Sequence, residues 1–178
     1  MIRNRKAPLV LLLLLALLSG CAHYSALETD RAIEIPKESI IYDDGDTITF
    51  GDITIRVLGI DTPEIAHPEH GFHEDQPYGR EAAARAEELI RAAKRVTYLP
   101  YQNDHYGRLL AHLFIDGDLL GVTLIEEGLA YETVSHYGDN GFPEIAAALL
   151  AAAERAPEPR FIPPHEWRQE HRKEPAGD

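Results

Sequence analysis

Three short segments rich in β-branched and aromatic residues follow one another at residues 39–43, 47–50 and 53–58. The turn sequences "DDGD" and "GD" separate them. Strands joined by such tight turns pair with their neighbours in an antiparallel sense. The pattern therefore predicts a three-stranded meander, and this meander limits the fold more than any other feature of the chain.

The rest of the chain adds two strands and several helices to the meander. An apolar stripe at helical spacing predicts a helix over 79–95, and β-rich segments predict strands at 96–101 and 109–115. Shorter patterns predict helices at 122–127 and 143–155. Five strands, with a helix between the third and fourth, favour an α+β fold. We expect a five-stranded, antiparallel OB-type β-barrel with about three helices.

The N-terminus has the pattern of an export signal. Three basic residues precede an apolar run at 9–18, which is too short to span a bilayer comfortably. The sequence "LLSGC" resembles the lipobox of bacterial lipoproteins. The resemblance implies cleavage before Cys21 and a lipid on its sulfur, which would anchor the protein to the cell envelope, facing the periplasm or the exterior. Position 22, directly after the modified cysteine, is alanine in place of aspartate. This resembles the pattern of lipoproteins that Gram-negative bacteria sort to the outer membrane.

These signals divide the chain into four parts. We expect a lipoprotein signal peptide at 1–20, a lipidated tether at 21–36, an OB domain at 37–156 and a proline-rich tail at 157–178. The tail is expected to pack an aromatic residue, Phe161 or Trp167, onto the domain. Cys21 is the only cysteine, which excludes disulfides and cysteine metal sites within the chain. A monomer is expected.

The charge of the chain opposes binding to nucleic acid at long range. The formal net charge is -13, and removing residues 1–20 with their three basic residues changes it to 14 minus 30, or -16. A field of this sign repels phosphates. A divalent cation bound at a carboxylate cluster would reverse the sign locally.

Two acidic motifs could form such a cluster. "DGDT" and "IDTPE" are each typical of a simple turn when taken alone. However, Asp46 begins the second strand and Asp61 follows the third, so antiparallel pairing would bring both carboxylates to one end of the sheet. Hard oxygen ligands suit Ca²⁺ far better than zinc. Glu64 lies three residues beyond Asp61, where it could orient or deprotonate a water molecule.

Two arginines on different strands could bind a phosphate near that cluster. Arg56 and Arg108 are non-titrating, bidentate partners for phosphate oxygens, and they could stabilise the charge of a transition state. Alone, a surface arginine is more often a solvated charge or half of a salt bridge.

Taken together, the motifs resemble the staphylococcal nuclease (thermonuclease) family. "DGDT", "RVLGIDTPE", "YGREA", "DHYGRLLAHLF" and "LIEEGLAY" occur in the family's order and near its spacing, over residues 38–155. The resemblance implies an OB barrel with helices. It also implies a calcium-dependent endonuclease that cuts DNA and RNA and leaves 3′-phosphates.

Carried over by position, the resemblance implies a role for six residues, none of them substituted. Asp46, Asp61 and the backbone carbonyl of Thr62 would bind calcium. Glu64 would be the catalytic glutamate, whose role as a true general base is debated. The phosphate-binding arginines would be Arg56 and Arg108.

The chain departs from the family in its substrate contacts. His105 stands where the best-known member has lysine, and an ungapped count puts Val134 and His136 at the family's stacking tyrosines. We take Tyr137 as a candidate base-stacking residue, and His105 and Tyr106 as candidate substrate contacts. The basic substrate loop is replaced by an acidic, histidine-rich one.

That loop carries histidines at every third position: His67, His70 and His73. Imidazole and carboxylate groups suit zinc or nickel. A solvated polar loop is the favoured interpretation, because Pro68 and Gly71 oppose the helix that would align the rings. Two alternatives to the nuclease hypothesis remain: a non-catalytic OB-fold lipoprotein that binds nucleic acid or protein, and a metal-binding lipoprotein that uses this loop.

Overall fold

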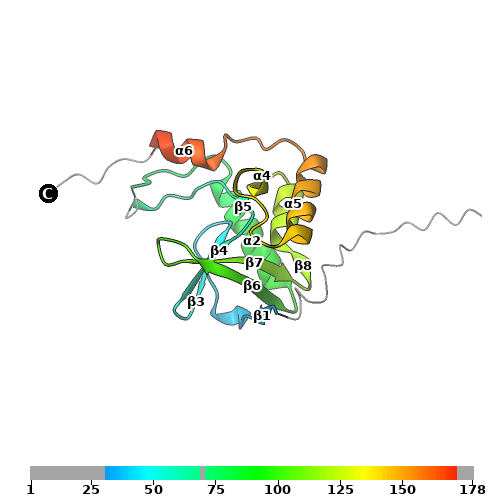
Figure 1. Cartoon of the computed structure of the whole chain (residues 1–178). Helices are drawn as coiled ribbons and strands as arrows, with labels where there is room; N and C mark the ends of the chain where they lie inside the picture. Colours follow the sequence, from blue (N-terminus) through cyan, green and yellow to red (C-terminus); the bar gives the residue numbers. More distant parts are fainter. Residues whose placement is uncertain (1–30, 69–70, 172–178) are drawn as a thin grey trace, which may run out of the picture.

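The computed structural model describes residues 31–68 and 71–171 of the chain. Cys21, the predicted signal peptide and most of the predicted tether lie outside the described residues. Within them, a curled sheet is covered by helices, and the last helix lies apart from the others near the end of the chain (Figure 1). No helix in these two ranges has the length and apolar character needed to cross a bilayer.

The predicted meander is present at one end of the sheet. It consists of β2 (Ile41–Tyr42), β3 (Thr47–Phe50) and β4 (Ile53–Val57), which pair as antiparallel neighbours. Ile48 lies opposite Ile55, and both are buried in the core. Thr47 lies opposite Arg56, so the start of β3 is beside the end of β4. This register determines where the functional side chains meet.

The sheet is mixed, whereas the sequence pattern predicted antiparallel pairing throughout. The antiparallel pair β6 (Val96–Asn103) and β7 (Leu109–Ile115) joins the meander through a parallel contact between β7 and β4. A long connection containing α2 (Gly79–Ala92) separates β4 from β6. Such a connection lets the chain return in the same direction, which a tight turn does not. The OB-type α+β class predicted from the sequence is nevertheless confirmed.

Several short strands escaped the sequence pattern. β1 (Ile33–Glu34) pairs with β6, and β8 (Asp118–Leu119) pairs with β7. β5 (Ile60–Asp61) and β9 (Tyr131–Glu132) form a separate two-stranded sheet. Because β1 is paired and Ile35 is buried, the ordered domain begins before residue 37, the start predicted from the sequence.

Three helices match predicted ones, and others do not. α2, α3 (Leu120–Glu126) and α5 (Pro143–Arg155) were expected; α4 (Val134–Tyr137), α6 (Pro164–His171) and the 3-10 helix η1 (Lys37–Ser39) were not. The described residues thus form five α-helices, more than the three predicted. The prediction also ran α2 to residue 95. It ends at Ala92 because the Asp116 carboxylate accepts the backbone N–H groups of Lys94 and Arg95.

One hydrophobic core joins the sheet to three of the helices. Its fully buried side chains come from both layers: Ile48, Ile55, Leu99, Leu113, Ile90, Leu124, Ile145 and Leu149. The tail also packs on the domain. Phe161 is buried, and its ring lies 6.0 Å from that of Tyr78 and 5.4 Å from that of Tyr131. The predicted aromatic anchor of the tail is therefore Phe161.

Candidate active site

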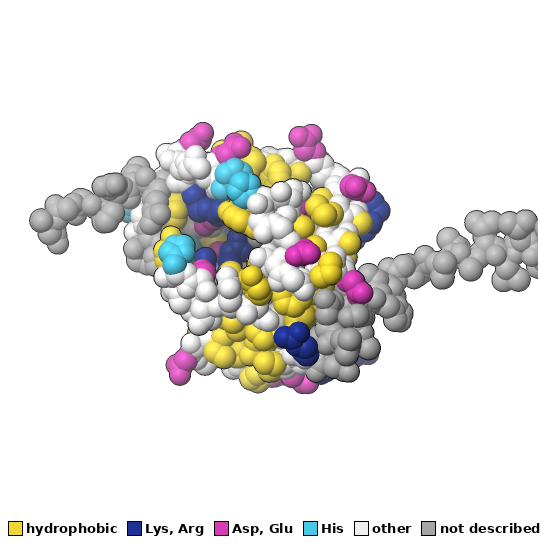
Figure 2. All heavy atoms as spheres, viewed as in Figure 1, with side chains coloured by type: hydrophobic (Ala, Val, Ile, Leu, Met, Phe, Trp, Pro, Cys, Tyr) yellow, Lys and Arg dark blue, Asp and Glu magenta, His cyan; other side chains and the backbone are white. Residues whose placement is uncertain are grey.

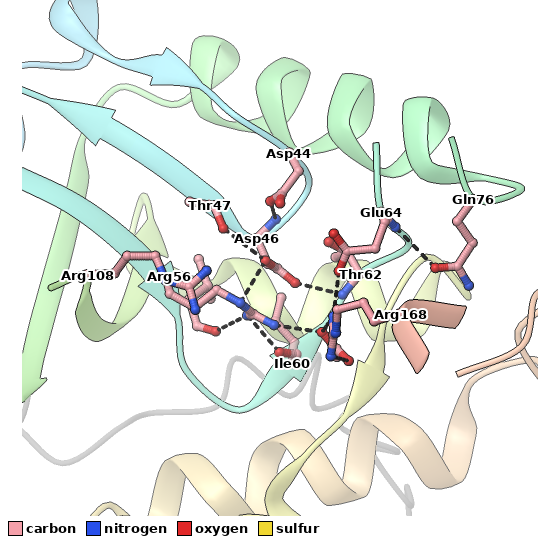
Figure 3. Close-up of polar contacts among 12 residues, drawn as sticks. Asp44, Asp46, Thr47, Arg56, Ile60, Thr62, Glu64, Gln76, Arg108 and Arg168 are labelled. Atoms are coloured by element: carbon pink, nitrogen blue, oxygen red, sulfur yellow. Dashed lines mark hydrogen bonds and ion pairs between the residues drawn. The ribbon is translucent and has the colours of Figure 1, made fainter. Parts of the chain in front are cut away.

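The two acidic motifs meet at the end of the meander. Asp46 precedes β3 and Asp61 ends β5, and both side chains are buried. The backbone N–H of Thr62 donates to Asp46 Oδ2 at 2.7 Å, which ties the second motif to the first (Figure 3). The N–H of Val57 also donates to the Asp46 carbonyl at 2.7 Å. The structure thus brings together three predicted residues: Asp46, Asp61 and Thr62.

Arg56 bridges the two carboxylates. Its Nε lies 3.1 Å from Asp46 Oδ1, and its Nη2 lies 2.7 Å from Asp61 Oδ1. Its Nη1 donates to the carbonyls of Val57 and Ile60 at 2.8 and 2.9 Å. Burial disfavours the charged guanidinium, but the attraction of Asp46 and Asp61 outweighs it and raises the pKa of Arg56. The guanidinium is therefore fixed by four contacts, which involve all three of its nitrogen atoms.

The carboxylates at this site are close enough to disturb one another. Burial, with the nearby Asp44 and Asp61 charges, raises the pKa of Asp46 to about 7. Burial is also the main cause that raises the pKa of Asp44 and of Glu64. Asp44 was considered only as part of a turn, yet its Oδ1 accepts the Asp46 N–H at 2.9 Å. This crowding of negative charge is what a bound divalent cation would relieve.

The available donors fit calcium better than a transition metal. All are hard oxygen atoms, and the buried Thr62 hydroxyl has no hydrogen-bond partner in the described part of the chain. In residues 31–68 and 71–171, no group of three or more His, Cys, Asp or Glu side chains is arranged to hold a metal ion. Asp46, Asp61 and the Thr62 carbonyl are the residues that would supply oxygen ligands to a calcium ion here.

Glu64 is held in place through its backbone. Its N–H donates to Gln76 Oε1 at 3.2 Å, and its carbonyl accepts the Gln76 N–H at 2.9 Å. Gln76 is almost fully buried. A Cβ added at Gly79 would lie 2.2 Å from the Glu64 carbonyl oxygen. Glycine at the start of α2 therefore allows the helix to approach the Glu64 backbone. Sequence reasoning assigned no role to Gln76 or Gly79.

Arg108 lies just before the strand that pairs with the Arg56 strand, but it has a different partner. It precedes β7, where Leu110 pairs with Arg56. Its Nε lies 2.9 Å from Asp104 Oδ2, and its side chain is 35% exposed. The Arg108 guanidinium also lies 5.5 Å from the centre of the Tyr106 ring. Arg108 thus points to the same side as Arg56 without contacting the acidic cluster (Figure 3).

The candidate substrate contacts lie at exposed positions. The rings of His105 and Tyr106 are 3.8 Å apart in the turn between β6 and β7, and Tyr106 is 65% exposed. Tyr137 ends α4, is 68% exposed and packs against His136 at 4.6 Å. Figure 2 shows basic side chains, with acidic ones between them, in a hollow of this face. Histidines lie at the edge of this hollow.

The predicted histidine set is described only in part. His67 pairs with Phe72 through an isolated β-bridge, and His73 is exposed. His70 lies outside the described residues. Whether this loop binds metal stays a prediction.

A further basic residue reaches the acidic cluster from the C-terminal end. Arg168, on α6, contacts both Asp61 and Glu64 (Figure 3). Sequence reasoning missed it, because it lies more than a hundred residues from its partners and outside every recognised motif.

Comparison with known proteins relates the chain to a family of nucleases. Residues 54–160 match the family described as "Staphylococcal nuclease homologue". The chain is 40% identical over 107 residues to the SPbeta prophage-derived endonuclease YokF of Bacillus subtilis (strain 168), covering 54% of this chain and 35% of that protein. It is 36% identical over 117 residues to endonuclease YncB of the same organism, covering 62% and 51%. It is also 36% identical over 92 residues to the thermonuclease of Staphylococcus intermedius, covering 49% and 53%. The chain thus spans about a third to a half of the length of these relatives.

Proposed function

Since the chain belongs to the staphylococcal nuclease family, we propose that it is a calcium-dependent endonuclease that hydrolyses phosphodiester bonds of DNA and RNA and leaves 3′-phosphates. One observation carries the proposal: a half-buried arginine, Arg56, joins the Asp46 and Asp61 carboxylates within the acidic cluster that contains Glu64. This arrangement combines groups for a cation, a water molecule and a phosphate.

The acidic residues supply the cation site and the base. Asp46, Asp61 and the Thr62 carbonyl would hold calcium, which would stabilise the negative charge that develops on the phosphate. Glu64 orients the attacking water and accepts its proton. The Gln76 contacts fix the Glu64 backbone, and with it the position from which the carboxylate projects.

The two arginines bind the phosphate from different starting states. Arg56 is preorganised by carboxylates, so its guanidinium lies in place before substrate arrives. Arg108 is partly exposed and pairs with Asp104, so it can exchange that carboxylate for a phosphate oxygen. Together they stabilise the transition state more than the ground state if the phosphate gains charge between them.

The exposed aromatic residues provide contacts for the rest of the substrate. Tyr106 lies beside Arg108, where a nucleotide adjoining the bound phosphate could stack. Tyr137 would stack on a second base and His105 would contact the backbone. Because the protein is acidic overall, cleavage should gain from moderate salt that screens long-range repulsion.

The test uses the full chain purified in detergent and labelled single-stranded DNA and RNA. We expect cleavage with calcium, none with EDTA and none with zinc alone. The products should need phosphatase treatment before a polymerase can extend their 3′ ends. Binding without cleavage in calcium would instead support the alternative, a non-catalytic OB-fold lipoprotein that binds nucleic acid or protein.

We further propose that the protein is attached to the cell envelope by a lipid on Cys21, on the outer membrane if the cell is Gram-negative. The motif "LLSGC" and the basic flank before it support this proposal. In cells that make the protein, mass spectrometry of the membrane fraction should detect a lipid-modified N-terminal cysteine. A Cys21→Ser variant should lose the lipid and leave that fraction.

A further inference from the structure

The chain returns to the acidic cluster through residues 161–168, which we call the C-terminal strap. Two backbone carbonyls fasten its first part to the domain. Tyr131 donates its hydroxyl to the Phe161 carbonyl at 2.8 Å, and Gln76 Nε2 donates to the Ile162 carbonyl at 2.7 Å. Phe161 and Pro164 are buried. The strap is therefore packed onto the domain before it reaches the site.

Arg168, at the end of the strap, contacts two carboxylates of the acidic cluster, Asp61 and Glu64. Its Nη2 donates to Asp61 Oδ2 at 2.9 Å, and its Nη1 donates to Asp61 Oδ1 at 3.1 Å. Nη1 also donates to Glu64 Oε1. One guanidinium thus holds both an expected calcium ligand and the expected base (Figure 3).

These contacts and calcium coordination compete for the same oxygen atoms. Asp61 Oδ1 already accepts from Arg56, so with Arg168 bound it has two donors, and Oδ2 has one. A divalent cation at Asp61 would also lie next to a positive guanidinium. Calcium and Arg168 therefore exclude or weaken each other.

We propose that the C-terminal strap is an autoinhibitory element: Arg168 holds Asp61 and Glu64 until a divalent cation displaces it. The proposal rests on the proposed function and adds a control to that same site. Gln76 extends the effect, because its side chain bonds both the Glu64 N–H and the strap carbonyl at Ile162. Release of the strap would thus alter a contact to the Glu64 backbone.

Trp167 offers a direct report of this displacement. It is the only tryptophan in the chain and precedes Arg168 on α6. Its ring stacks on His171 at 3.4 Å, and its buried Nε1 has no hydrogen-bond partner among the described residues. Movement of the strap would change the surroundings of the indole, and with them its fluorescence.

The experiment measures calcium binding to the full chain, purified in detergent, by calorimetry and by Trp167 fluorescence. We expect Arg168→Ala to bind calcium at least tenfold more tightly than the unsubstituted protein. Arg168→Lys keeps the charge but loses the bidentate contact, so it should fall between the two. Arg160→Ala is the matched control: it removes the same charge from an exposed residue one position before the strap, and should change affinity less than threefold.

Fluorescence separates displacement from a simple change in charge. In the unsubstituted protein, the Trp167 signal should change along the calorimetric binding curve. In Arg168→Ala the calcium-dependent change should be smaller, since this variant has no guanidinium for the cation to displace. Equal calcium affinity in Arg168→Ala and the unsubstituted protein would overturn the proposal. Calcium binding without a change in Trp167 fluorescence would also overturn it, as would no calcium binding at all.

The same samples distinguish this inference from the proposed function. Calcium-dependent cleavage with an unchanged calcium affinity in Arg168→Ala would refute the strap alone. Calcium binding that displaces the strap without any cleavage would refute the nuclease assignment alone. If Arg168→Ala weakens binding of single-stranded DNA and leaves calcium affinity unchanged, Arg168 binds substrate and the autoinhibitory proposal is wrong.

Discussion

The meander and the C-terminal strap reach the same carboxylates by different routes. The meander places Asp46 and Asp61 through strand register and one backbone hydrogen bond, over 15 positions of sequence. The strap places Arg168 through an aromatic anchor and two side-chain hydrogen bonds from distant segments. Local strand geometry thus brings the Asp46 and Asp61 carboxylates together. Tertiary packing adds the positive charge of Arg168, which opposes the proposed binding of a cation there.

The two regions also differ in how their arginines are held. Arg56 has contacts to two carboxylates and two carbonyls, and its side chain is 16% exposed. Arg168 is 34% exposed, and its guanidinium contacts the carboxylates of Asp61 and Glu64. A more exposed ion pair is worth less and responds more to competing ions. Of the two arginines, Arg168 is therefore the one that the proposed mechanism expects calcium to displace.

The largest expected effect comes from the meander side. Glu64→Gln keeps the size of the side chain but removes the base, so turnover should fall by roughly 10² to 10⁴. Binding of single-stranded DNA should remain. Single-turnover cleavage with saturating calcium measures the loss, and Glu154→Gln, at an exposed position on α5, is the control. If the turnover of Glu64→Gln is within threefold of that of the unsubstituted protein, Glu64 is not the base.

A smaller but still large effect is expected where α2 meets the Glu64 backbone. Gly79→Ala adds a Cβ that would lie 2.2 Å from the Glu64 carbonyl oxygen, so one of the two segments must move. A misplacement of about 1 Å at a reacting group can cost about 10² in rate. We expect a loss of this order, with unfolding easier by about 1–3 kcal/mol.

Gly117→Ala separates misplacement of Glu64 from a general loss of stability. Gly117 has φ +96 and no neighbour within 4 Å of an added Cβ, so its substitution strains only a distant turn. Chemical denaturation and cleavage should be measured on both variants. If they lose activity in equal measure at equal stability, Gly79 does not act through Glu64.

The sequence predicted the meander side of this comparison far better than the strap. Asp46, Asp61 and Arg56 lie in contiguous motifs whose strand register is set by short turns, so their meeting followed from local patterns. The parallel contact of β4 with β7 did not, because it depends on a crossover. Arg168 has no local signal: its position depends on Phe161 and on a glutamine 86 residues before Ile162. It also lies beyond the family match, which ends at residue 160.

The smallest effect is expected at Gln76, where the two regions are joined. Gln76→Ala removes the acceptor for the Glu64 N–H and the donor for the Ile162 carbonyl, which costs about 1–3 kcal/mol for the groups left unpaired. Cleavage at saturating calcium should fall about tenfold, because the Glu64 backbone is less fixed. Calcium should also bind more tightly, because the strap has lost one of its fastenings.

Gln76→Ala is thus expected to slow cleavage and to tighten calcium binding. Because these two effects differ in direction, the two measurements test the two Gln76 contacts separately. Gln169→Ala, at an exposed position on α6, is the control and should alter neither quantity. Slower cleavage with unchanged calcium affinity would mean that Gln76 serves the meander alone and that Arg168 keeps its place without the Ile162 contact. Tighter calcium binding with unchanged cleavage would mean the reverse: Gln76 holds the strap, while Glu64 is positioned by Gly79 and the turn that contains it.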